Sequence, residues 1–157
     1  MARIERVQKV YFWIAIASAG LGVVSSSGCS PLPTFPSGVL WVLHPLLFLL
    51  GAVSGALNLR RSEQIDRQRW EVAEDSTVTR GEREYAHKEA ESERRWAGVC
   101  FAGCPLMLGY WLAYQVTTES GRVEAHLLPV TGIAGFAVGL GIAKTLGRGA
   151  LKIGRKT

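Results

Sequence analysis

Four long apolar segments, separated by short or charged stretches, constrain this chain more than any other feature. They cover residues 7–25, 39–58, 97–116 and 127–147. Each is close to the ~20 residues that a helix needs to cross the ~30 Å hydrocarbon core of a bilayer. Because the bilayer interior offers the backbone no water to bond, such segments must be helical. The sequence therefore predicts an all-α integral membrane protein, in which residues 1–157 form a single membrane domain of four transmembrane helices in two hairpins.

The charged residues are concentrated outside these segments. Apolar residues make up 48% of the chain and charged residues 20%, which on average resembles a soluble protein. However, nine basic and ten acidic residues lie between Arg60 and Arg95 alone. Such segregation is typical of a membrane protein rather than of a soluble core. The net charge of +5 comes from basic residues near the two ends of the chain. It indicates membrane topology, and no nucleic-acid partner is expected.

The placement of basic residues also predicts the orientation. Apart from Arg122, every Lys and Arg lies near the N-terminus, between the second and third apolar segments, or near the C-terminus. Loops rich in Lys and Arg remain on the cytoplasmic side of a membrane. We therefore expect a multi-pass protein of the cell inner (cytoplasmic) membrane, with both termini and the central charged block in the cytoplasm.

The central block, residues 59–96, has helix signals but few large apolar residues. Thr79 and Glu82 have the spacing of a helix-capping box. Three acid-before-base pairs at i,i+4 support helices on either side: Glu63/Arg67, Glu84/Lys88 and Glu91/Arg95. We predict two cytoplasmic helices, at about residues 58–75 and 80–96, which extend the second and third membrane helices as a charged hairpin. Each arm would project ~25 Å at 1.5 Å per residue.

A stripe of small residues marks the fourth apolar segment. Its members recur at every fourth position: Thr131, Gly135, Gly139, Ala143 and Gly147. The second segment has a matching pair, Gly51 and Gly55. Small residues at this spacing let two helix backbones approach closely in a membrane. The stripe can serve internal packing or contact with another subunit. We favour internal packing, because four short helices must pack against one another.

Basic residues continue the same four-residue period beyond the stripe. They are Lys144, Arg148, Lys152 and Lys156. A basic face at the cytoplasmic surface suits anionic lipid headgroups. It is equally explained as a positive-inside anchor.

His44 is the one histidine expected well inside an apolar segment. A polar residue at membrane depth is a candidate ligand, and His126 on the same side invites a haem interpretation. The depths of the two differ by ~7 Å at 1.5 Å per residue, which is poor for facing axial ligands. We therefore expect a neutral, packed His44 and no cofactor. Cys100 and Cys104 lack the further ligands of a structural zinc site, and no metal is expected.

Residues 3–29 resemble the signal of a bacterial lipoprotein. They combine a basic start, an apolar stretch and small residues before Cys29. Two features depart from that pattern: Ser26 stands where an aliphatic residue is usual, and the apolar stretch is longer than a typical signal core. We therefore expect an uncleaved first membrane helix.

The function must be inferred without a catalytic motif. The sequence contains no Ser–His–Asp arrangement, metalloprotease motif or phosphate loop. None of the four apolar segments contains Asp or Glu, which argues against an ion-coupled transporter. We predict a non-catalytic membrane subunit, not an enzyme, which packs against or stabilises a larger membrane assembly. Its partners would be other membrane subunits, copies of itself and anionic lipids. The alternatives are a homo-oligomeric membrane pore or channel, and a cofactor-binding electron-transfer subunit that uses His44.

Overall fold

The computed structural model describes residues 2–27, 35–75, 77–116 and 124–153. Its principal elements are α1 (Ala2–Ser26), the short 3₁₀ helix η1 (Ser37–Val39), α2 (Leu40–Glu74), α3 (Arg80–Gln115) and α5 (Leu128–Ile153). Four of these helices, α1, α2, α3 and α5, contain stretches long and apolar enough to cross a membrane. The prediction of an all-helical fold with four helices long and apolar enough to cross a membrane is confirmed.

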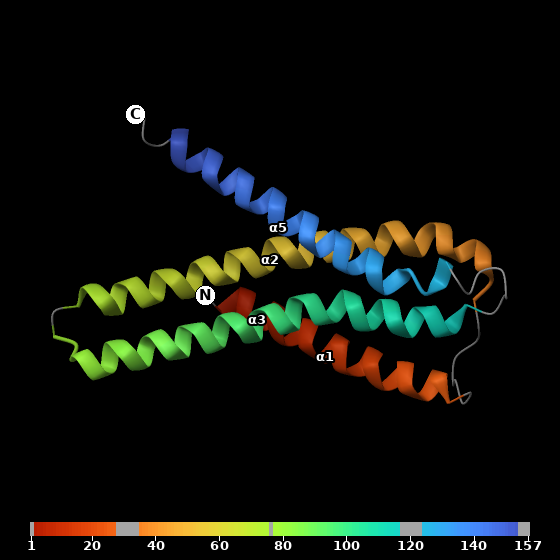
Figure 1. The fold of residues 1–157 in the computed structure, drawn as a ribbon, viewed down its shortest axis with the longest axis horizontal. Coiled ribbons are helices and arrows are strands. Elements are labelled where there is room, and N and C mark those ends of the chain that lie inside the picture. Colours follow the sequence, from red (N-terminus) through yellow and green to blue (C-terminus); the bar gives the residue numbers. More distant parts are fainter. Residues whose placement is uncertain (1, 28–34, 76, 117–123, 154–157) are drawn as a thin grey trace.

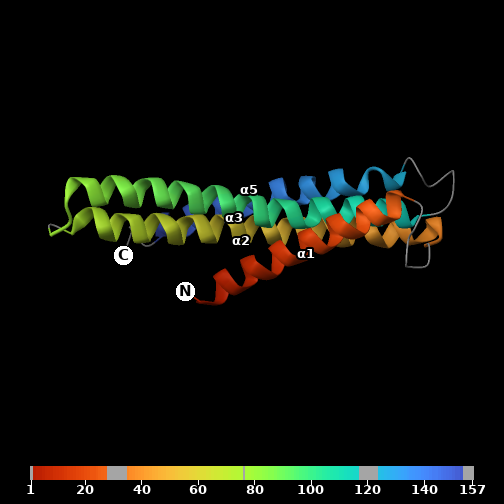
Figure 2. The ribbon, with the colours of Figure 1, turned by 90° about the horizontal axis from the view of Figure 1, so that it is seen from below.

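Helix α3 is the centre of the bundle and packs against the other three long helices (Figures 1 and 2). Its most apolar stretch is 44% buried, whereas those of α1 and α5 are 11% and 17% buried. Phe101 and Leu112 supply large buried side chains to this core. The most extensive packing joins α1 to α3 and α2 to α5. Helices that follow one another in the chain are thus not the main packing partners, although the chain runs back and forth along the bundle.

Helices α2 and α3 are longer than their apolar segments. Each continues into the charged block without a break, so that the two run side by side as a two-helix arm (Figures 1 and 2). We refer to residues 59–96 as the charged hairpin. Ile65 and Ala90 are buried between its helices, and Arg94 forms an ion pair with Asp66 across them. The outer helices also exceed the predicted segments, since α1 begins at Ala2 and α5 continues to Ile153.

The tip of the charged hairpin is fixed by side-chain hydrogen bonds to the backbone. The capping box is confirmed: the Thr79 backbone N–H and hydroxyl donate to Glu82 Oε2, both at 2.8 Å, and the Glu82 N–H donates to Thr79 Oγ1 at 3.4 Å. The Thr79 N–H and then its hydroxyl lower the pKa of Glu82 from its ordinary 4.5. Hydrogen bonds from the Thr77 hydroxyl and N–H likewise lower the pKa of Asp75. The carboxylates therefore act in their charged form.

Two of the three predicted i,i+4 pairs are present on α3. Lys88 pairs with Glu84 at 3.2 Å, and Arg95 pairs with Glu91 at 2.6 Å. The described residues show no ion pair between Glu63 and Arg67. All of these side chains are solvated to a large degree, so each such pair adds only ~0.3–0.5 kcal/mol.

The opposite end of the bundle has its own small apolar core. Leu40 and Leu47 of α2 pack there with Leu112 of α3 and Leu128 of α5. The Phe35 N–H donates to the carbonyl of Gln115 at 2.6 Å. This bond ties the segment before α2 to the end of α3. The candidate lipoprotein Cys29 lies outside the described residues.

Candidate functional site

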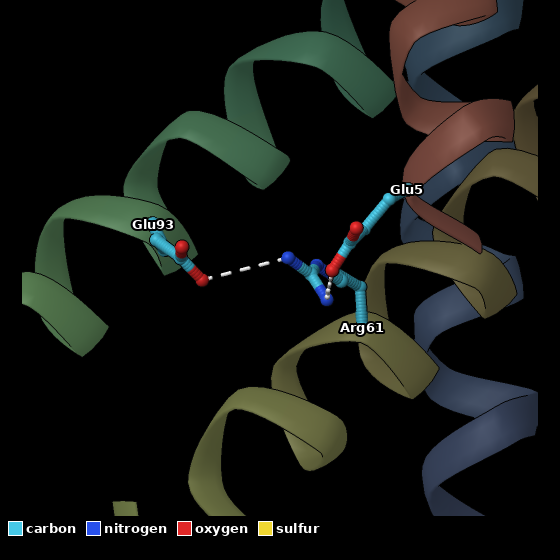
Figure 3. A network of polar contacts seen from close by, with 3 residues as sticks. All are labelled: Glu5, Arg61 and Glu93. Atoms are coloured by element: carbon cyan, nitrogen blue, oxygen red, sulfur yellow. Dashed lines mark hydrogen bonds and ion pairs between the residues drawn. The ribbon is translucent and has the colours of Figure 1, made fainter. Parts of the chain in front are cut away.

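A buried arginine joins three helices at the boundary between the apolar and charged parts of the molecule. Arg61 of α2 lies between Glu5 of α1 and Glu93 of α3 (Figure 3). Its Nη1 is 3.2 Å from Glu5 Oε1, and its Nη2 is 3.5 Å from Glu93 Oε2. The Arg61 side chain is only 8% exposed, while the two carboxylates are about half exposed. A guanidinium this buried requires such partners, since an unpaired charge would be strongly destabilising.

The partners do not satisfy all the donors of Arg61. Its Nε and Nη1 have no hydrogen-bond partner among the described residues. The Glu5 oxygen is close enough to Nη1 for an ion pair but is poorly directed for a hydrogen bond. Buried donors left in this state cost free energy. The described residues thus satisfy the hydrogen-bonding capacity of the Arg61 guanidinium only in part.

A pocket of about 290 Å³ lies beside this arginine. Its lining residues come from three helices: Glu5, Gln8, Lys9, Phe12, Arg61, Glu93, Trp96 and Cys100. On α1 and α3 the lining positions repeat at three- and four-residue intervals, so each helix presents one face. Figure 2 shows α1 diverging from α2 and α3 towards its N-terminus. The lining residues place the pocket between these three helices. We call this space the Arg61 pocket.

The predicted small-residue stripe lies where α2 and α5 cross. A Cβ atom at Gly135 would collide with the Phe48 carbonyl, and one at Gly139 would collide with the Ala52 carbonyl. On the facing helix, Gly51 and Gly55 meet the backbone of α5 in the same way. We call these four glycines the glycine seam. The backbones of α2 and α5 are in direct contact here. The glycines of each helix are therefore covered by the other helix of the same chain.

After Gly139, the small-residue stripe of α5 diverges from α2. Ala143 and Gly147 line a groove of about 430 Å³ between α2 and α5. A Cβ atom at Gly147 would meet only a Glu63 side-chain oxygen, at 3.8 Å. The close contact is therefore limited to the first part of the stripe. Figure 1 shows the C-terminal part of α5 leaving the bundle.

His44 bonds to the first residue of that stripe. His44 Nδ1 lies 2.8 Å from the Thr131 hydroxyl oxygen, which also lies 3.0 Å from the Leu127 carbonyl oxygen. This contact joins α2 to α5. The described residues contain no cluster of three or more His, Cys, Asp or Glu that could hold a metal ion.

The remaining candidate residues are not brought into one site. Lys144 is exposed on α5, whereas Lys156 and the side chains of Arg148 and Lys152 lie outside the described residues. Cys100 and Cys104 are buried free thiols on α3. The function of the basic stripe therefore remains a prediction from the sequence.

Large side chains are left exposed on the charged hairpin. Trp70 of α2 is 62% exposed and Tyr85 of α3 is 69% exposed. Because aromatic residues are enriched where proteins bind each other, exposed ones on a polar helix mark a candidate interface.

Family models, curated proteins and solved structures show no match to this chain. No sequence motif singles out Glu5, Arg61 or Glu93. Each of the three is a charged residue within a few turns of an apolar segment, and this position could have marked it as a candidate. That signal does not reveal which charges face one another, since this depends on how three helices pack.

Proposed function

We propose that the chain is a non-catalytic, multi-pass subunit of a larger membrane assembly, and that the charged hairpin is its docking element. In this proposal the four apolar helices span the cell inner membrane, with both termini and the hairpin in the cytoplasm. The observation that carries it is the exposure of Trp70 and Tyr85 on a long arm whose helices bury little between them. A partner that covers these aromatic residues would stabilise the arm.

The glycine seam supports the same assignment by elimination. Its backbone contacts are made between α2 and α5, so the seam serves to hold the subunit together. Attachment to other subunits therefore falls to a different surface. The charged hairpin carries the exposed aromatic side chains of Trp70 and Tyr85.

The pore alternative gains less support. A pore needs a continuous polar face along its helices. Ser54 donates instead to the Leu50 carbonyl of its own helix, and Gln115 donates to Ser25. These polar groups act as internal links. The electron-transfer alternative would use Nε2 of His44, because Nδ1 contacts the Thr131 hydroxyl.

Native mass measurement in mild detergent tests the proposal. We expect the chain together with foreign subunits at a fixed stoichiometry. Replacing both Trp70→Ala and Tyr85→Ala should remove those subunits. Trp41→Ala is a matched control, because Trp41 is 87% exposed but lies at the opposite end of α2. Homogeneous multiples of the chain mass, or partners retained by the hairpin variant, would contradict the docking proposal.

A further inference from the structure

The Arg61 pocket lies at the depth of lipid headgroups. Arg61 follows the last apolar residue of its segment, Leu57, by four positions, or ~6 Å along the helix. Each headgroup layer of a bilayer is roughly 5–8 Å thick. Trp96, just before the third apolar segment, lines the same pocket, and Trp is enriched at this interface. The pocket is therefore open to the polar parts of lipids in the surrounding membrane.

The pocket carries charges of both signs. Arg61 and Lys9 are cationic, and Glu5 and Glu93 are anionic. A ligand that is only an anion would meet two carboxylates, and one that is only a cation would meet the guanidinium and the ammonium. A zwitterion can place each of its charges against the opposite sign. Charge complementarity thus selects a dipolar ligand.

The donor side of the pocket matches a phosphodiester. Arg61 lines the pocket, and its side chain is only 8% exposed. A guanidinium group forms strong charge-assisted hydrogen bonds with phosphate oxygens. Lys9 lines the same space and adds a second positive charge.

The acceptor side matches an ammonium group. The side chains of Glu5 and Glu93 are 47% and 48% exposed, so their oxygens remain accessible. Phe12 and Trp96, whose ring centroids are 5.1 Å apart, add aromatic surface beside them. A cation gains from both carboxylates and aromatic faces. A primary ammonium also donates hydrogen bonds to the carboxylates, which a quaternary ammonium cannot do.

We propose that the Arg61 pocket binds the headgroup of phosphatidylethanolamine. The phosphodiester lies against Arg61 and Lys9, and the ammonium lies between Glu5 and Glu93. The pocket volume of about 290 Å³ is near the lower end of the ~300–1,000 Å³ typical of small-ligand sites. Because the acyl chains stay in the surrounding bilayer, the pocket needs to hold only the headgroup. This site requires the membrane placement of the proposed function but no partner protein.

Lipid retention by the purified full chain tests this site. The protein in mild detergent is given equal amounts of phosphatidylethanolamine, phosphatidylglycerol and phosphatidylcholine with the same acyl chains, and bound lipid is read by native mass spectrometry. We expect phosphatidylethanolamine to be retained in preference to both others. Glu5→Gln and Lys9→Gln should each weaken its retention about tenfold, as expected for loss of one charge-assisted hydrogen bond. Glu71→Gln, on an exposed part of α2 away from the pocket, should leave retention unchanged.

Other outcomes would overturn the proposal in different ways. Equal retention of phosphatidylglycerol would show a simple anion site, and equal retention of phosphatidylcholine would show that the ammonium donates no hydrogen bonds. If soluble glycerophosphoethanolamine competes as strongly as the lipid, the site recognises a free headgroup instead. Thermal unfolding of each variant shows whether it is folded. Since the assay contains no partner protein, its failure would leave the docking proposal intact.

Discussion

The apolar and charged parts of helix α2 hold their neighbours in opposite ways. In the apolar part, Gly51 and Gly55 bring its backbone directly against that of α5. In the charged part, α2 meets α3 through Ile65 and Ala90, with an ion pair between Asp66 and Arg94 beside them. The first contact gains dispersion over a continuous surface. The second buries little and depends on solvated charges, which contribute modestly.

This difference assigns separate roles to the two regions. The glycine seam tolerates no added atom, so it fixes the geometry of the subunit. The charged hairpin leaves Trp70 and Tyr85 exposed, so it can adapt to a partner. The Arg61 pocket lies between them, where α1 diverges from the bundle. Substitutions in one region should therefore leave the other largely unchanged.

The largest effect is expected at the glycine seam. Gly139→Leu places a branched side chain against the Ala52 backbone. Overpacking of this kind costs ~1–3 kcal/mol, and a backbone neighbour cannot rotate away. We expect a clear loss of thermal stability in detergent. Val138→Leu, at a position 42% exposed on the same helix, is the control and should change little. If both variants melt like the parent, the seam does not determine stability.

A smaller and local effect is expected at the tip of the hairpin. Thr79→Ala removes the hydroxyl of the capping box, and the loss of such a cap costs roughly 1 kcal/mol. Hydrogen exchange should accelerate in the first turn of α3, while the apolar part of α3 keeps its protection. Ser92→Ala, exposed within the same helix, should change neither region. Equal acceleration along all of α3 would show that the two regions unfold together.

His44→Gln should change stability still less. The amide of Gln can hydrogen-bond to the Thr131 hydroxyl in place of the ring Nδ1. Side-chain hydrogen bonds between membrane helices contribute ~0.6 kcal/mol on average, so even an imperfect replacement loses little. Melting temperature and absorbance of the purified variant check this. Loss of a bound metal or chromophore on substitution would identify His44 as a ligand and contradict its packing role.

The smallest effect is a pH dependence confined to the hairpin. The folded pKa of Glu82 is lowered, so its contribution is present above the ordinary 4.5 and is lost as pH falls through the lower folded value. Exchange in the first turn of α3 should therefore increase at acidic pH. Glu82→Gln should flatten this dependence. A parent profile that already matches the variant would mean that the capping carboxylate is unimportant.

The sequence predicted the elements better than their contacts. Length and apolar composition were sufficient for the four helices, and the spacing of Thr79 and Glu82 was sufficient for the capping box, because both are local properties. The pairing of α1 with α3 could not be predicted, because apolar composition alone does not specify which helices become neighbours. The Arg61 pocket was missed for the same reason. Its residues come from three helices and meet only after packing.

The placement of the hairpin relative to the membrane is the claim on which the proposed function depends most directly. Single cysteines at Pro33, Thr77 and Gly121, in a background without Cys29, Cys100 and Cys104, can be probed in intact cells with a membrane-impermeant thiol reagent. The proposal predicts labelling at positions 33 and 121 and none at position 77 until the membrane is opened. Labelling of position 77 in intact cells would place the charged hairpin outside and contradict the proposed cytoplasmic docking.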